Sequence, residues 1–173
     1  SQLARLFRIS LSKGRTIISI KDELQHAQSY MNIQKIRYKN TFSVEFDVAP
    51  ELYAYCTVKL ILQPILENSI SYGVGEMDDC GEIRVEGKME GGEILLSVTD
   101  NGIGMSKEEA GLVLTDSNRI RKRGSGVGLV NVNRRIQIYF GKEYGLTVES
   151  EPDEGTKVTI RIPAVPYTEE DTL

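Results

Sequence analysis

The segment around Asp100 combines a carboxylate with two closely following glycines. It reads Asp100-Asn101-Gly102-Ile103-Gly104 and comes directly after a stretch with the alternating pattern of a strand. At the end of a central strand, Asp100 would accept a hydrogen bond from an exocyclic amine, while the glycines let a flat ring approach the backbone. An Asn-Gly turn that closes a hairpin is the alternative, although no strand-like run follows these residues.

A second glycine motif opens a stretch with helical period over residues 127–140. It reads Gly124-Ser125-Gly126-Val127-Gly128-Leu129. Backbone N–H groups at the N-terminus of a helix bind phosphate, and glycines let the phosphate come close. The motif follows an irregular loop, which excludes a Rossmann fingerprint, and it lacks the Gly-Lys-Ser/Thr end of a Walker P-loop. A flexible hinge is the alternative.

A third unusual segment lies in a stretch rich in Ile and Leu, with helical period over residues 57–73. Glu67 and Asn68 are adjacent polar residues in this stretch, and Tyr72 follows Asn68 by one helical turn on the same side. Pro64 either kinks this helix or marks its true start. An exposed polar stripe on an amphipathic helix is the alternative to a functional site.

The composition excludes several classes of protein. The chain has 173 residues, of which 40% are hydrophobic and 27% charged, and this suits one compact domain rather than a disordered tail or a membrane bundle. No apolar run is long enough to cross a bilayer, and no signal-peptide pattern opens the chain. A formal net charge of −4 argues against a dedicated nucleic-acid binder, and two cysteines are too few for a disulfide scaffold. These features predict a domain in a reducing cytoplasm.

Hydrophobic periodicity predicts the elements that position these residues. Alternation with a period of two predicts strands at 42–48, 83–89, 94–99, 145–150 and 156–162, with a hairpin turn at 90–92. Helical period predicts helices at 1–12, 20–38, 57–73, 106–112 and 127–140, and Ser106 with Glu109 fits a capping box. Hairpin-linked strands and helices that need an apolar cover predict a two-layer α+β sandwich.

In their order along the chain, the segments around Asn68, Asp100 and Gly126 together resemble the GHKL (Bergerat) ATP-binding domain. This superfamily joins gyrase-type topoisomerases, heat-shock chaperones, MutL proteins and sensor histidine kinases, and the resemblance covers residues 42–163. The flanking residues are similar to the LytS/YesM group of two-component sensor histidine kinases, in Ile33-Gln34-Lys35-Ile36-Arg37-Tyr38, Gln63-Pro64 and Tyr139-Phe140-Gly141. The resemblance implies an α+β sandwich whose mixed, mainly antiparallel sheet is covered by helices on one face.

The resemblance also implies a site for ATP and Mg²⁺. On this basis Asn68 binds the Mg²⁺ on the nucleotide phosphates, Glu67 is the catalytic base, and Asp100 binds the adenine amino group. Thr156 matches a threonine that supports a water at the adenine site. The other residues expected at the nucleotide are Tyr72, where relatives often have His or Lys, and Gly102, Ile103, Gly104, Gly124, Ser125, Gly126, Val127, Gly128 and Leu129. A short lid carries four cations that either reach the γ-phosphate or form a solvated charge run: Arg119, Arg121, Lys122 and Arg123.

The implied activity is that of an ATP-dependent protein-histidine kinase. On this interpretation residues 1–40 are a helical linker at the end of a dimerisation and phosphoacceptor region, 41–165 are the ATP-binding catalytic domain, and 166–173 are a frayed tail. The γ-phosphate would go to a histidine upstream of Ser1, in the same protein or its dimer partner, and then to a response regulator. The parent would be a membrane-bound homodimer with this domain in the cytoplasm and no nucleic-acid partner.

His26 is the only histidine in the chain, and its context differs from that of a phosphoacceptor. We therefore interpret it as a surface histidine of the linker helix. The alternative function is a GHKL-type ATP hydrolase or a nucleotide-gated binding module, in which Glu67 would activate water. A third possibility is an α+β binding domain without nucleotide. The short lid and the linker helix favour the kinase.

Overall fold

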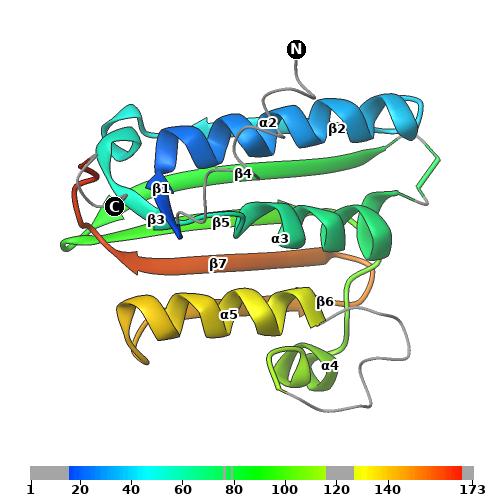
Figure 1. Ribbon diagram of the computed structural model, residues 1–173. Coiled ribbons are helices and arrows are strands. Elements are labelled where there is room, and N and C mark those ends of the chain that lie inside the picture. Colours follow the sequence, from blue (N-terminus) through cyan, green and yellow to red (C-terminus); the bar gives the residue numbers. More distant parts are fainter. Residues whose placement is uncertain (1–15, 76, 79, 116–126, 169–173) are drawn as a thin grey trace.

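A five-stranded sheet forms one layer of the molecule, and helices form the other (Figure 1). The computed structural model describes residues 16–75, 77–78, 80–115 and 127–168. The strands are ordered β2 (Phe42–Val48), β4 (Gly81–Glu90), β5 (Glu93–Asp100), β7 (Gly155–Pro163) and β6 (Gly145–Glu151). β2 and β4 pair in parallel, and the other neighbours in the sheet pair antiparallel. The α+β sandwich with a mixed, mainly antiparallel sheet is therefore confirmed.

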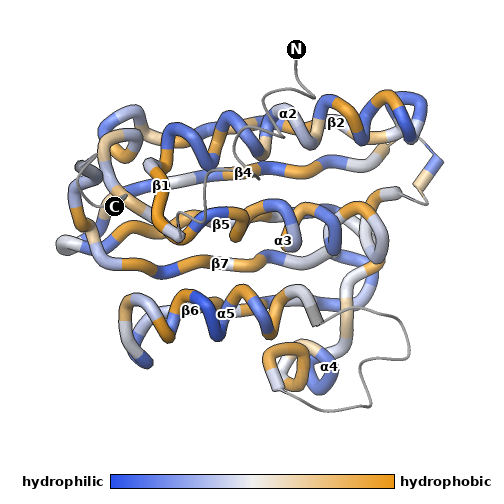
Figure 2. The backbone as a smooth tube through the Cα atoms, viewed as in Figure 1, coloured by the Kyte–Doolittle hydropathy of each residue, from blue (hydrophilic) through white to orange (hydrophobic). Residues whose placement is uncertain are grey.

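Three helices cover one face of this sheet. α2 (Ile20–Arg37), α3 (Leu62–Ser69) and α5 (Val127–Phe140) lie side by side over it (Figure 1). Along β5, Ile94, Leu96 and Val98 are buried, while the alternate residues are partly exposed. Figure 2 shows apolar and hydrophilic residues alternating along β7 as well. The period of two therefore directs one side of each strand into a core that the sheet shares with the helices.

The prediction of a helix at 57–73 is wrong for its first residues, 57–61. Cys56–Val58 forms strand β3, which pairs antiparallel with β1 (Ile17–Ser19), and the helix begins at Leu62. Pro64 lies in its first turn, where a missing N–H breaks no intrahelical hydrogen bond, so it marks the start rather than a kink. After Ser69 the backbone widens into a π-helical turn, η2 (Ile70–Val74). Helical spacing of apolar residues does not exclude a short strand that pairs with a distant segment.

The shorter helices follow local signals in the sequence. α4 (Lys107–Leu112) is capped by Ser106, whose Oγ accepts the N–H of Glu109 at 3.1 Å, so the predicted cap is confirmed. η1 (Pro50–Ala54) connects β2 to β3. The helix predicted at 1–12 lies outside the described residues. Within the described ranges, every helix is too short or too polar to cross a membrane.

α2 packs into the common core rather than standing apart from it. Its residues Ile20, Leu24, Ala27 and Met31 are buried in the same cluster as the inward residues of the sheet. The boundary at residue 40 between a linker and a catalytic domain stays a prediction. The structure adds that residues on both sides of this boundary contribute to one core.

A buried carboxylate from α2 caps the N-terminus of α3. Glu23 Oε1 accepts the N–H of Leu60 at 2.7 Å, and Oε2 accepts the N–H groups of Ile61 and Leu62 at 2.8 and 2.9 Å. Burial raises the pKa of Glu23, and these three hydrogen bonds act in the opposite direction. Because the first N–H groups of a helix have no intrahelical partner, the carboxylate supplies what the helix start lacks.

We expect Glu23→Gln to destabilise the fold by about 1–3 kcal/mol. The substitution keeps the shape of the side chain but places an NH₂ group where an oxygen accepts from the backbone. Urea unfolding followed by circular dichroism measures the change. Glu51→Gln, at an exposed position of η1, is the matched control. Equal stability of the two variants would contradict the capping role.

Candidate functional site

The carboxylate of Asp100 is buried at the end of the central strand β5. Asp100 continues the inward face of the strand and is 6% exposed. Its Oδ1 accepts the N–H of Gly102 at 2.9 Å, and the Ser69 hydroxyl and the Thr156 N–H also donate to the carboxylate. Burial raises the pKa of Asp100, and the donated hydrogen bonds partly oppose this. The result is an oriented acceptor, held in place from three segments of the chain.

Glycines allow these segments to approach the carboxylate. A Cβ placed on Gly73 of η2 would lie 3.0 Å from Asp100 Oδ1, and a Cβ on Gly102 would collide with the backbone of Gly73. Gly104 has a φ of +67°, and a Cβ there would collide with the carbonyl of Glu151. Packing within the protein therefore requires Gly102 and Gly104 to be glycine. Their contact with a nucleotide stays a prediction.

A hydroxyl network joins the loop after β5 to the hairpin of β6 and β7. Thr156 lies opposite Asp100 in the register of β5 and β7, and its Oγ1 lies 2.8 Å from Ser150 Oγ. Ser150 Oγ also accepts the N–H of Met105 at 2.8 Å and donates to the carbonyl of Gly155 at 2.8 Å. The structure thus brings Thr156 beside Asp100. A role of Thr156 in supporting a bound water stays a prediction.

Consecutive residues of α3 face different neighbours, because each helical residue is rotated by about 100° from the one before it. Ser69 faces the sheet and donates to Asp100. Glu67 is exposed and accepts a hydrogen bond from Gln63 Nε2 at 3.0 Å. Gln63 in turn lies 2.6 Å from His26 of α2, measured between Oε1 and Nε2, so Glu67 is on the α2 side of α3.

Asn68 lies between these two directions and faces α5. It is half-buried and follows Pro64 by one turn, and the Cβ of Pro64 lies 3.3 Å from a Cβ placed on Gly128 at the start of α5. In the described part of the chain, no group of three His, Cys, Asp or Glu side chains could hold a metal. A single amide oxygen near a helix N-terminus fits a Mg²⁺ ion whose other ligands are water and phosphate oxygens.

The start of α5 carries the described part of the second glycine motif. Val127 begins the helix as predicted, and Gly128 is half-buried. Leu129 packs into the core with 1% exposure, so only its backbone is available to a ligand. The following residues lie outside the described part of the chain: Gly124, Ser125, Gly126, Arg119, Arg121, Lys122 and Arg123.

Two large hydrophobic residues remain accessible, and each is the sequence neighbour of a glycine that packs near the carboxylate of Asp100. Tyr72, next to Gly73, is 36% exposed, and Ile103, next to Gly102, is 53% exposed. Apolar surface beside a buried hydrogen-bond acceptor is typical of a site for a flat, mostly apolar ligand with one polar edge. Contact of either side chain with a nucleotide stays a prediction.

The sequence analysis missed Ser69 and Gly73 and misplaced His26. His26 is 1% exposed, so its interpretation as a surface histidine is wrong. Ser69 and Gly73 follow the buried Ile65 at steps of one helical turn, where a helix packed on a sheet usually carries apolar residues. A small polar residue and a glycine at these positions were the signal of a polar group beneath the helix.

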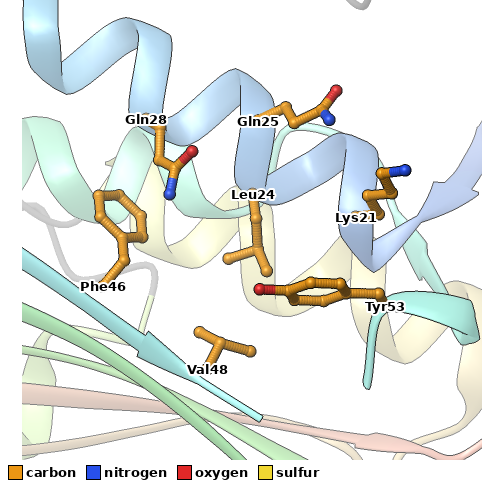
Figure 3. Close-up of a pocket in the computed structure, with 7 residues that line it drawn as sticks. All are labelled: Lys21, Leu24, Gln25, Gln28, Phe46, Val48 and Tyr53. Atoms are coloured by element: carbon orange, nitrogen blue, oxygen red, sulfur yellow. The ribbon is translucent and has the colours of Figure 1, made fainter. Parts of the chain in front are cut away.

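A hollow of about 200 Å³ lies elsewhere, between α2, β2 and η1 (Figure 3). Leu24, Phe46, Val48 and Tyr53 form its apolar walls. Its polar rim comes from α2 and consists of Lys21, Gln25 and Gln28. Among the described residues predicted to bind a nucleotide, none lines this hollow, so this part of the predicted site and the hollow are separate.

The fold and the polar groups at the end of β5 define an ATPase domain of the GHKL type. The model of the family described as "Histidine kinase-, DNA gyrase B-, and HSP90-like ATPase" matches residues 57–166, and the chain belongs to this family. The model of a second family, described as "Histidine kinase", matches residues 1–42. The recognition of this family from the three motifs is confirmed.

The curated relatives include LytS and YesM sensor proteins. The chain is 34% identical to the sensor histidine kinase YesM of Bacillus subtilis and 31% identical to the sensor histidine kinase BtsS of Escherichia coli, each over 93% of this chain. It is 32% identical to the sensor protein LytS of Bacillus anthracis over 94% of this chain. The chain spans 26%, 26% and 28% of the length of these relatives, respectively.

Solved structures share the fold. The catalytic domain of the histidine kinase ThkA superposes with a TM-score of 0.67 at 15% identity, over 88% of this chain and 97% of that one. The mycobacterial sensor histidine kinase MprB superposes with a TM-score of 0.63 at 19% identity, over 88% of this chain and 99% of that one. At these identities the superpositions show a common architecture.

We expect Gly102→Ala to destabilise the fold by about 1–3 kcal/mol, because its Cβ would overpack against the backbone of Gly73. Gly111→Ala is the matched control, since nothing lies within 4 Å of a Cβ at this position of α4. The control should be neutral or up to about 1 kcal/mol more stable. Urea unfolding without nucleotide measures both. Equal effects would show that Gly102 is not required by packing.

Proposed function

We propose that this chain is the ATP-binding catalytic part of a two-component sensor histidine kinase. It would transfer the γ-phosphate of ATP to a histidine elsewhere in a longer protein, for relay to a response regulator. One observation carries the proposal: four groups suited to a nucleotide lie on α3 or next to it. They are the buried acceptor Asp100, the amide of Asn68, the exposed carboxylate of Glu67 and the N-terminus of α5. Membership of the ATPase family and the sensor-kinase relatives support it.

Adenine recognition follows from the burial of Asp100. The carboxylate would accept a hydrogen bond from the exocyclic amine of adenine, and guanine has a carbonyl oxygen at the equivalent position. Because a buried acceptor left facing another acceptor loses its partner and its hydration together, the site discriminates against guanine. Gly102 and Thr156 lie beside this acceptor, Gly104 follows in the same loop, and Ile103 and Tyr72 supply accessible apolar surface nearby.

The phosphates would lie between α3 and the start of α5. The N-terminal N–H groups of α5 at Val127, Gly128 and Leu129 favour an anion. Asn68 would hold Mg²⁺ through its amide oxygen. When bound, Mg²⁺ supplies charge neutralisation to the phosphates in the transition state.

Glu67 is the candidate base. In the transfer, a nitrogen of the acceptor imidazole bonds to the γ-phosphorus, the bond to the bridging oxygen breaks, ADP leaves, and Glu67 accepts the imidazole proton. The exposure of Glu67 leaves it accessible to an incoming side chain. His26 is buried and hydrogen-bonded to Gln63, which supports a phosphoacceptor other than His26.

The rest of the parent protein belongs to this proposal as well. The curated relatives are about four times as long as the segment they share with this chain, since that segment is 26–28% of their length. We propose a membrane-bound homodimeric parent with this domain in the cytoplasm. A GHKL hydrolase or nucleotide-gated module is the second candidate, because an exposed Glu67 would activate water as readily as it would an imidazole.

We expect Asp100→Asn to lower ATP affinity by about tenfold or more and to reduce the preference for ATP over GTP, because the amide offers an NH₂ group to the guanine carbonyl. Isothermal titration with each nucleotide in the presence of Mg²⁺ measures both effects. Asp47→Asn, on an exposed position of β2, is the control and should bind like the unsubstituted chain. Unchanged affinity and selectivity in Asp100→Asn would remove Asp100 from the adenine site.

Labelled phosphate distinguishes the kinase from the hydrolase. With γ-³²P-ATP and Mg²⁺, the chain alone should take up no label, and it should label a separately supplied upstream helical segment of its parent on histidine. Asn68→Ala should abolish the transfer, because the metal loses its protein ligand. Label on His26, or release of inorganic phosphate with no labelled histidine, would contradict the kinase assignment.

A further inference from the structure

We infer that His26 of α2 is a positioning residue for Glu67 and acts through Gln63. The inference rests on the proposed function in one respect, that Glu67 is the base of phosphoryl transfer. It goes beyond that function by assigning a role to the only histidine of the chain and to the helix that carries it.

Two hydrogen bonds connect the three side chains. Gln63 Nε2 donates to Glu67 Oε1 at 3.0 Å across one turn of α3, and Gln63 Oε1 lies 2.6 Å from His26 Nε2. A carboxylate only accepts, so the NH₂ group of Gln63 must point towards Glu67 and its oxygen towards His26. His26 Nε2 must then carry a hydrogen and donate it. The direction of both hydrogen bonds is therefore determined: His26 donates to Gln63, and Gln63 donates to Glu67.

The His26 end of these two hydrogen bonds is held in the core. His26 is 1% exposed on α2, in a helix whose neighbouring residues Leu24 and Ala27 belong to the core. Gln63 is half-buried between the two helices, and Glu67 is exposed. A free glutamate at the surface samples several rotamers, whereas a fixed donor restricts it to those that keep the hydrogen bond.

The other nitrogen of His26 argues against a packing role alone. Nδ1 is buried and has no hydrogen-bond partner in the described structure. A buried polar atom without a partner costs free energy that an apolar side chain of similar size would avoid. The hydrogen bond from Nε2 to Gln63 is what an apolar side chain cannot provide.

Tyr30 follows His26 by one helical turn on the same side of α2. Burial raises the pKa of Tyr30, and the negative charge of Glu67 adds to this as a smaller cause. Together with the hydrogen bonds of Gln63 to His26 and Glu67, this indicates that the side of α2 carrying His26 faces the side of α3 carrying Gln63 and Glu67.

The test separates turnover from binding. The readout is phosphoryl transfer from MgATP to the separately supplied upstream helical segment, in which an imidazole nitrogen bonds to the γ-phosphorus, the bond to the bridging oxygen breaks, ADP leaves, and Glu67 accepts the imidazole proton. His26→Leu and Gln63→Leu should each lower kcat about tenfold at saturating MgATP, with KM and the calorimetric Kd unchanged, because neither side chain touches the nucleotide. The double variant should lose no more than either single one, since both act through one contact.

Rescue distinguishes positioning from packing. His26→Gln keeps a donor nitrogen about as far from the backbone as Nε2 and should retain at least a third of the kcat. Met31→Ala, at another buried position of α2, should lower the unfolding temperature at least as much as His26→Leu does and leave kcat unchanged. All rates are measured well below the lowest unfolding temperature.

Several results would overturn the inference. They are an unchanged kcat in His26→Leu, additive losses in the double variant, a loss in Met31→Ala as large as in His26→Leu, or no rescue by His26→Gln. A rate in the unsubstituted chain no higher than in Glu67→Gln would also overturn it, because there would be no base to position. Failure of MgATP to bind at all would instead show as an absent calorimetric signal, which contradicts the proposed function itself.

Discussion

The carboxylate of Asp100, buried at the end of the central strand, is the constraint on which the site depends. A charge in this position must be met by donors, because an unpaired buried charge is prohibitively costly. The donors come from three separate segments: Ser69 at the end of α3, Gly102 in the loop after β5, and Thr156 on β7. Bringing these segments together leaves no room for a side chain on Gly102 and little room for one on Gly73. The shape of the site is therefore a consequence of satisfying one carboxylate.

A second buried carboxylate acts at the opposite end of α3. Glu23 accepts three backbone N–H groups at the helix start, while Asp100 receives Ser69 at the helix end. Arg135 of α5 adds hydrogen bonds to the carbonyls of Lys59 and Leu60, just before the helix begins. α3 is thus held at both ends, which determines the direction in which each of its side chains points.

This arrangement explains how adjacent residues of one helix can have different roles. Ser69 faces the sheet and the carboxylate of Asp100, Asn68 lies on the side towards the start of α5, and Glu67 faces α2. Binding and transfer of a phosphate mostly require groups held in position rather than covalent chemistry by the protein. A short helix fixed by two buried carboxylates supplies that positioning.

Much of this could be predicted from local patterns, and the rest depends on distant contacts. Alternation predicted the five strands of the large sheet, and because that alternation continues to the last residue of β5, it also places Asp100 on the inward side. The order of the motifs indicated the family. It also indicated that Asp100 and Thr156 belong to one site, and the two residues lie opposite each other on β5 and β7. The pairing of β1 with β3 and the burial of Glu23 and His26 could not be predicted, because each depends on a segment roughly forty residues away.

The most direct test of a nucleotide site at the end of β5 is a titration of the ¹⁵N-labelled chain with MgATP, followed by amide NMR spectra. We predict shifts at Gly102, Thr156 and Gly128, which lie in three different segments around α3. Shifts confined to Lys21, Gln25 and Tyr53, around the hollow between α2 and β2, or no shifts at all, would contradict it.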